Sequence, residues 1–227
     1  MFAVIFEVQP KRERWNDYLE LAKFLKPRLD AVEGFIDNER FASKRTEGRL
    51  LSLSTWRDEK AVVRWRTEGE HHGVQEKGRF EIFADYHLRV GEITVDSDPP
   101  HGLGVVEKRF DETETGAAKL VTITELVPAG KDGLAAIAGA LAPQLGLAPN
   151  AAGLVDREVF ESIYSPGKLL LLASWRNAAD ASRWAPKHPA AAKSLRHRHV
   201  RVIRDYGMYE RREAPQFYPP VEGKQAS

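Results

Sequence analysis

The sequence predicts an α+β fold in which two small units follow one another, each with the order strand, helix, strand, strand, helix, strand. Three observations support this: the length of 227 residues, an internal repeat of domain size, and the same succession of hydrophobic patterns in each half. A chain of this length accommodates two domains of roughly 110 residues, each long enough to bury a core.

The internal repeat has a period of 119 residues. Across residues 41–65, ten of 25 positions are identical to the residue 119 positions later. Chance would give about one or two identities. The identical pairs are Phe41/Phe160, Ser43/Ser162, Gly48/Gly167, Leu50/Leu169, Leu51/Leu170, Leu53/Leu172, Trp56/Trp175, Arg57/Arg176, Arg64/Arg183 and Trp65/Trp184. A period of this size indicates a tandem domain duplication. The predicted domains are residues 1–96 and 105–213, joined by a linker rich in turn residues and followed by a C-terminal tail, 214–227.

The elements of the first half follow from periodicity. Alternating apolar residues predict a strand over 2–8, and helical spacing predicts a helix over about 13–30. Residues 35–43 and 50–56 are predicted strands joined by a turn at Glu47-Gly48. Asp58 is a suitable N-cap for a helix through roughly residue 68. Alternation from Phe80 to Val90 predicts the fourth strand.

The second half repeats this order. Strands are predicted over 120–127, 154–162, 169–175 and 200–210, and helices over 133–145 and 178–184, the latter with a further turn. This is the split βαβ order of a ferredoxin-like sheet with both helices on one face. The opposite face needs a cover, and the sheet of the other copy is the expected one.

Composition excludes several classes of function. Lys and Arg total 34 against 33 Asp and Glu, so no net charge draws the chain to nucleic acid or to an anionic membrane. A basic cluster at 193–201 lacks the interleaved aromatics of a nucleic-acid site. The absence of cysteine excludes disulfides and thiolate chemistry, and no metal-binding motif is present. No signal-like or membrane-spanning segment is evident, so a cytoplasmic location is expected.

The first half resembles the antibiotic biosynthesis monooxygenase (ABM) family, a family of dimeric ferredoxin-like α+β barrels. The residues that carry the resemblance are Phe41-x-Ser43, Gly48 to Leu53 with Trp56, Asp58-Glu59-x-Ala61, Trp65-Arg66, Glu70-His71-x-x-x-Gln75-x-x-Gly78-Arg79 and Phe83-x-Asp85-Tyr86-x-x-Arg89-Val90. The second half keeps Phe160, Gly167, Trp175, Arg176, Trp184, His188, Asp205 and Tyr206.

This resemblance implies sheets paired as in a dimer, with a small cavity between each sheet and its helices. A chain with two such units can form this pseudo-dimer alone, and a further homodimer of two chains stays possible.

Candidate site residues follow from this expected cavity. His71 is the preferred general base, with His72 as the alternative, because a neutral imidazole accepts protons near pH 7. Trp65 and Tyr86 complete the predicted catalytic set. The predicted substrate-binding residues are Trp56, His72, Trp175, Trp184, His188 and Tyr206. For the tryptophans core packing is the competing interpretation, and for the tyrosines a structural hydrogen bond.

The resemblance implies a small-molecule monooxygenase that oxygenates an aromatic or polycyclic substrate with dioxygen and no tightly bound organic cofactor. The alternative within the superfamily is a haem-binding or haem-degrading protein. Known members of that type use an Asn on the first strand, where this chain has Glu7 and, in the second half, Glu125. A third hypothesis is a non-catalytic ligand-binding protein, because the second half does not keep the histidine motif found around His71.

Overall fold

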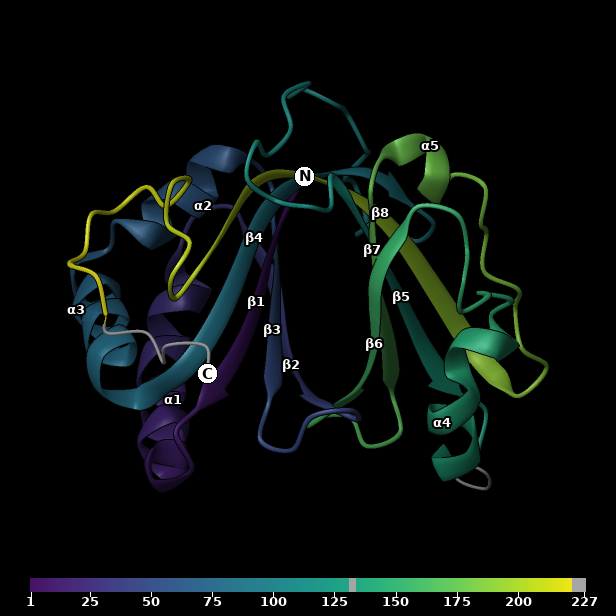
Figure 1. Ribbon diagram of the computed structural model, residues 1–227, viewed down its shortest axis with the longest axis horizontal. Coiled ribbons are helices and arrows are strands. Elements are labelled where there is room, and N and C mark those ends of the chain that lie inside the picture. The colour runs from purple at the N-terminus through teal and green to yellow at the C-terminus, as the bar shows by residue number, and fades with distance from the viewer. Residues whose placement is uncertain (131–133, 222–227) are drawn as a thin grey trace.

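The computed structural model describes residues 1–130 and 134–221, and within them eight antiparallel strands close into one barrel (Figure 1). The predicted helix start at Gly133 and the last six residues of the tail lie outside the described residues. The strands of the first half are β1 (Phe2–Pro10), β2 (Phe35–Ser43), β3 (Leu50–Trp56) and β4 (Phe83–Asp96). Those of the second are β5 (Leu120–Pro128), β6 (Leu154–Ser162), β7 (Leu169–Trp175) and β8 (Ala192–Gly207).

Each half forms a four-stranded sheet, in the order β4-β1-β3-β2 and β8-β5-β7-β6. This order confirms the predicted pair of ferredoxin-like units. The halves join at two seams. At the short seam β2 pairs with β6 over Phe41–Ser43, and at the long seam β4 pairs with β8 from His87 to Asp96. The barrel therefore has no free sheet edge.

The barrel interior is an apolar core to which both halves contribute. Ile5, Phe41 and Leu53 meet Ile123, Phe160 and Leu172, and all six are buried. Each residue of the first set precedes its counterpart by 118 or 119 positions, so the core is itself duplicated. The prediction that each sheet covers the inner face of the other is confirmed.

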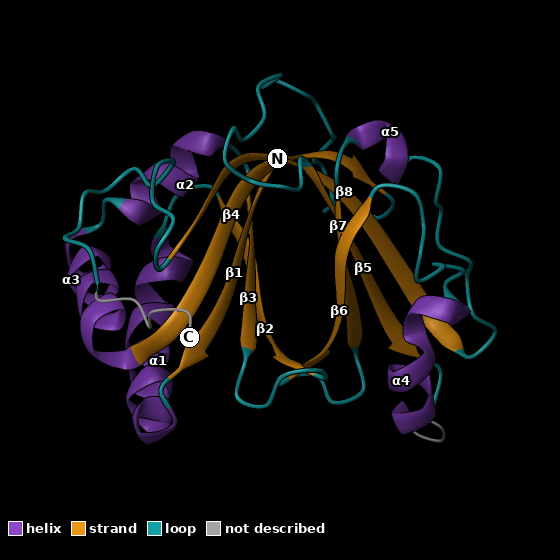
Figure 2. Ribbon diagram, viewed as in Figure 1, coloured by secondary structure: helices purple, strands orange, loops and turns teal. Residues whose placement is uncertain are grey.

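The helices lie outside the barrel, on its two flanks (Figure 2). The first half carries a short 3-10 turn (Arg12–Arg14), α1 (Trp15–Ala31), α2 (Glu59–Arg66) and α3 (Gly69–Lys77). The second carries α4 (Leu134–Gln144) and α5 (Ala178–Ala181). None of the described helices is long and apolar enough to cross a membrane.

The fourth strands and their preceding helices differ from the sequence prediction. Residues 78–82 form a π-helical turn after α3, so β4 begins at Phe83 rather than at Phe80. β8 begins at Ala192, eight residues before the predicted start, because it pairs with β5 as far as Pro128. The predicted helix over 178–184 ends at Ala181, since Pro186 and Pro189 follow closely and the chain turns into β8.

The segment between β4 and β5 covers one end of the barrel (Figure 1). Leu103 and Val105 pack against the interior core, and the buried carboxylate of Glu92 accepts hydrogen bonds from the backbone N–H groups of Lys108 and Arg109. The linker is thereby fixed to the first half.

Candidate active site

A cavity of about 220 Å³ lies between the outer face of the first sheet and helices α1 to α3. Strand alternation builds its floor, because Val4 and Phe6 of β1 face outward while Ala3 and Ile5 face the barrel core. Leu88 and Val90 extend this floor on β4. The α-helices supply the opposite wall through Leu21, Leu25, Trp65, His71 and Gln75.

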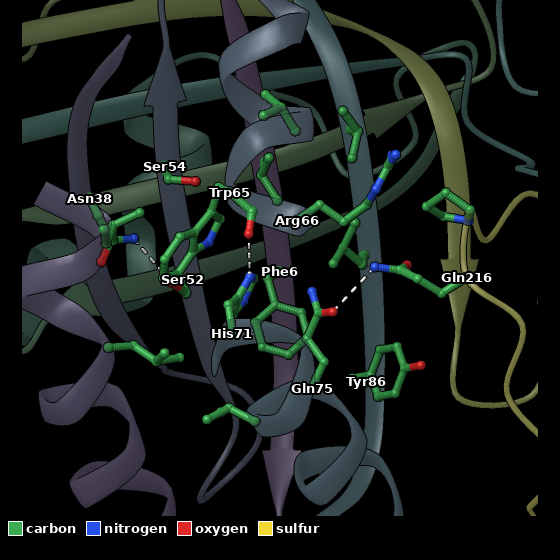
Figure 3. Close-up of a pocket in the computed structure, with 18 of the residues that line it drawn as sticks. Phe6, Asn38, Ser52, Ser54, Trp65, Arg66, His71, Gln75, Tyr86 and Gln216 are labelled. Carbon is green, nitrogen blue, oxygen red and sulfur yellow. Dashed lines mark hydrogen bonds between the residues drawn. The ribbon is translucent and has the colours of Figure 1, made fainter. Parts of the chain in front are cut away.

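Trp65 and His71 form the central pair of this wall (Figure 3). Their rings are stacked, with centroids 3.9 Å apart and an interplanar angle of 15°. His71 Nδ1–H donates to the carbonyl oxygen of Trp65 at 2.8 Å, which leaves the lone pair on Nε2. Burial lowers the pKa of His71 to about 4, so the imidazole is neutral at pH 7.

The break between α2 and α3 sets the position of His71. Glu68 is the N-cap of α3, and its carboxylate accepts from the backbone N–H of His71 at 2.7 Å. The chain therefore starts a new helix instead of continuing α2. His71, and not His72, then turns toward Trp65 and the cavity.

Three neutral polar side chains lie together in the cavity wall formed by β2 and β3. Asn38 Nδ2 donates to Ser52 Oγ and to the Leu53 carbonyl, both at 3.0 Å, and Ser54 lies beside them (Figure 3). Asn38 Oδ1 is buried and has no hydrogen-bond partner among the described residues. Asn38, Ser52 and Ser54 are not among the residues predicted from the sequence, although they share the outward register of two predicted strands.

The cavity lining includes Tyr86 and Tyr206. Tyr86 accepts hydrogen bonds from Arg211 Nη1 at 2.6 Å and from Arg79 Nη1 at 3.2 Å. Tyr206 comes from β8 of the second half, and burial raises its pKa to about 12, so its hydroxyl stays protonated. The site is therefore shared between the two copies.

Arginine side chains dominate the charge of the lining. Arg40, Arg66, Arg204 and Arg211 line the cavity, and none has a carboxylate within 4.0 Å in the part of the chain that the structure describes. Among the described residues, the one carboxylate of the lining is that of Glu59, which pairs with Arg109. An apolar cavity with uncompensated guanidinium groups favours an anionic ligand.

The structure places the remaining predicted residues elsewhere. Trp56 is fully buried, and its indole N–H donates to Ser54 Oγ at 2.9 Å, behind the cavity wall. His72 and His188 are exposed on the surface: Nδ1 of His72 lies 3.4 Å from the Tyr218 hydroxyl, and Nδ1 of His188 lies 3.1 Å from the carbonyl oxygen of Pro189. The predicted residues that line the cavity together are His71, Trp65, Tyr86 and Tyr206.

A packed core occupies the corresponding space of the second half. Trp175 and Trp184 stack with ring centroids 6.0 Å apart, and the Trp184 indole N–H donates to the Leu145 carbonyl at 3.2 Å. Leu141 and Leu171 fill the space around them. Both tryptophans therefore take the core-packing role that competed with substrate binding.

Glu7 and Glu125 point into the barrel, away from the cavity. Glu7 pairs with Arg89, and Glu125 with Arg198. The two arginines are 109 positions apart and so lie outside the 119-residue repeat, but they are equivalent in strand pairing, since Arg89 lies opposite Ile5 and Arg198 opposite Ile123. Burial alone would raise the pKa of Glu7, but Arg89, His87 and Arg49 outweigh it and lower that pKa to about 2. Among the described residues, no group of three or more His, Asp or Glu side chains is placed to hold a metal ion.

A closed barrel of two ferredoxin-like halves, with its cavity between one sheet and its helices, defines the class of dimeric α+β barrels, here within one chain. The sequence profile of the family "Antibiotic biosynthesis monooxygenase" matches residues 1–77. The "Jasmonate monooxygenase ABM" of Pyricularia oryzae is 44% identical over 226 residues, which cover 97% of this chain and 100% of that protein. The chain therefore belongs to the antibiotic biosynthesis monooxygenase family, and the prediction of a monooxygenase of this type is confirmed.

Two further proteins are similar to part of the sequence or to the fold. The "Uncharacterized protein YqjZ" of Bacillus subtilis is 30% identical over 92 residues, covering 40% of this chain and 78% of that protein. Among solved structures, an aldoxime dehydratase in complex with butyraldoxime is 12% identical and covers 88% of this chain and 79% of its own, with a TM-score of 0.56. That likeness concerns the fold alone.

Proposed function

We propose that this protein oxygenates a small amphipathic organic acid, of the jasmonate class, in the cavity of its first half. One observation carries the proposal: the cavity is apolar over the sheet but lined by four arginines without a carboxylate partner among the described residues. The name of the 44% identical relative supports the same substrate class. The volume of about 220 Å³ suits a compact ligand, since pockets for drug-sized ligands are about 300–1,000 Å³.

The charge distribution suggests how the acid binds. Its carboxylate would lie near Arg66 or Arg204, because the Nη groups of Arg211 already donate to the Tyr86 hydroxyl and to the Gln216 carbonyl. Its apolar part would cover Phe6 and Leu88. In this orientation the polar groups of the ligand other than its carboxylate would face His71 Nε2.

The proposed role of His71 is to accept a hydrogen bond and then a proton. With a pKa of about 4 the free imidazole is a weak base. A carboxylate bound in the same cavity would raise that pKa, because a nearby negative charge favours the imidazolium form. Substrate binding would thus strengthen the base that the reaction uses.

The electron balance separates two reactions with dioxygen. Conversion of an activated CH₂ group to a carbonyl consumes one O₂ and releases one water, so the substrate supplies all the electrons. Hydroxylation of an unactivated carbon needs two further electrons and two protons from a reductant.

The test incubates the protein with jasmonic acid and isotopically labelled dioxygen, with and without NADPH, and analyses the products by mass spectrometry. Labelled product supports the proposal; labelled product from anthrone but not from jasmonic acid would contradict it in favour of the aromatic substrate predicted from the sequence.

Arg66→Gln tests the binding of the acid. We expect KM for jasmonic acid to rise roughly ten- to hundredfold with kcat little changed, because a charged hydrogen bond contributes about 1.5–3 kcal/mol. The matched control is Arg64→Gln on the same helix, whose guanidinium faces Glu33 at the surface. Equal KM values for Arg66→Gln and the parent protein would exclude Arg66 as the anchor.

Several expectations from the sequence stay predictions. They are the absence of a bound organic cofactor, the haem alternative, a homodimer of two chains and the cytoplasmic location. A Soret band after addition of haem tests the second, and the mass of the protein in solution tests the third.

A further inference from the structure

The C-terminal strap, residues 208–221, leaves β8 of the second half and lies over the helices of the first half (Figure 1, yellow). Pro215, Gln216 and Tyr218 line the same cavity as His71. The strap has no regular secondary structure. One backbone hydrogen bond, from the Met208 N–H to the Tyr86 carbonyl oxygen at 3.0 Å, joins its first residue to β4, and side-chain contacts hold the rest in place.

Two arginines fasten the strap to the first half. Arg79 is 2% exposed, and it donates to the carbonyl oxygens of Met208 at 2.7 Å and Pro219 at 3.3 Å, near both ends of the strap. Arg211 links the Tyr86 hydroxyl at 2.6 Å to the Gln216 carbonyl at 3.0 Å. A buried guanidinium that satisfies two backbone carbonyls fixes the path of the chain.

Side chains of the strap then alternate between the cavity and solvent. Gln216 Nε2 donates to Gln75 Oε1 at 3.2 Å (Figure 3), and the Tyr218 ring stacks on His72 at 5.9 Å. Phe217, between them, is 90% exposed. The strap therefore presents one face to α3 and the cavity.

We infer that Gln216 and Tyr218 form the wall that sets how long a substrate the cavity accepts. This inference rests on the proposed function, because it concerns the acid bound there. It also gives the second copy a role: its own helix-side space is filled by Trp175 and Trp184, while its Arg204, Tyr206 and strap complete the site of the first copy. The substrate class is then a carboxylic acid whose apolar chain has an upper limit of length.

The test compares Gln216→Ala and Tyr218→Ala with Phe217→Ala as the matched control. Binding of jasmonic acid and of hexanoic, octanoic, decanoic and dodecanoic acids is followed by tryptophan fluorescence. In the parent protein affinity should rise with chain length and then fall. Both wall variants should accept longer acids and bind jasmonic acid roughly tenfold more weakly, whereas Phe217→Ala should match the parent. An unchanged length limit in both wall variants would overturn the inference.

A second measurement needs no substrate. If the parent protein binds none of these acids, the proposed function fails, and the wall is tested by acrylamide quenching of Trp65. A chain ending at Ala214 should show stronger quenching than one ending at Val221, with Trp65→Phe in each chain to isolate the signal. Equal quenching of Trp65 in the two chains would overturn the inference independently of the substrate.

Discussion

His71 is held by contacts that leave one nitrogen free. The Trp65 carbonyl accepts from Nδ1, the Trp65 ring covers one face of the imidazole, and the Glu68 carboxylate fixes the backbone. These contacts define the tautomer and the direction of Nε2 before any substrate arrives. A preorganised acceptor loses little free energy in ordering when the substrate binds.

The lowered pKa of His71 predicts an unusual pH profile. Because burial lowers the pKa to about 4, the protonated form accumulates only as pH falls through about 4, and kcat/KM should lose this group's contribution there rather than near 6.5. The constant kcat reports the substrate complex, in which the bound carboxylate raises the pKa of His71, so the same loss should occur at higher pH. The measurement is a pH series of both constants. His71→Gln should lower kcat by about 10²-fold or more and lack this limb; a limb that persists in His71→Gln belongs to another group.

At the residue scale, the sequence predicted part of the site. The family motif favours His71 over His72, and the capped start of α3 places His71 in the cavity. The sequence does not distinguish core packing from substrate binding for Trp56 and Trp65, because each is a tryptophan with an identical counterpart in the second half. Only packing separates the fully buried Trp56 from Trp65, which lines the cavity.

At the scale of elements, α2 depends on its N-cap. Asp58 accepts from the backbone N–H of Ala61 at 2.9 Å, as the sequence predicted, and the helix then presents Trp65 and Arg66 to the cavity. The equivalent cap in the second half is Asn177, which accepts from the backbone N–H of Asp180 at 2.8 Å. Both copies therefore begin this helix in the same way, but only the first extends it.

Asp58→Ala should lower the free energy of unfolding by about 1 kcal/mol, because an N–H at the helix N-terminus loses its acceptor. The measurement is urea denaturation followed by circular dichroism. Asp58→Asn keeps an acceptor and should recover most of the loss. A full loss in Asp58→Asn would mean that the ion pair of Asp58 with Arg57, and not the cap, stabilises the helix.

The bounds of α3 and of the fourth strands could not be predicted from local sequence patterns. Residues 69–82 contain few apolar residues at regular spacing, and α3 and its π-helical turn are held by the Glu68 cap and by burial of Arg79 and Ile82. The early start of β8 follows from pairing with β5 and not from its own alternation. Such elements are decided by partners distant in the sequence.

At the scale of the whole molecule, the long seam between β4 and β8 joins the two copies. Gly91 lies in this seam, where the register shifts by one residue. A Cβ at this position would overlap the carbonyl oxygen of Arg201 and lie 2.6 Å from Val200 Cγ1. Glycine therefore permits the close approach of the two backbones.

Gly91→Ala should lower the free energy of unfolding by roughly 1–3 kcal/mol, because the clashing atom belongs to the backbone and cannot rotate away. Gly104→Ala is the matched control, since no heavy atom lies within 4 Å of its added Cβ. Urea denaturation should show this control within about 0.5 kcal/mol of the parent. Equal free energies of unfolding for Gly91→Ala and Gly104→Ala would mean that β4 and β8 can be spaced more widely without loss of stability.

The sequence by itself determined the duplicated ferredoxin-like units, most strand boundaries and the family, because alternation and a 119-residue repeat are properties of the chain alone. Tertiary structure decided that the first copy keeps a cavity, that Trp175 and Trp184 pack into a core on the helix side of the other, and that residues 208–221 return to line the first. These outcomes depend on which side chains meet across seams and helix faces. That information lies in the packing between segments, not in the pattern within any one of them.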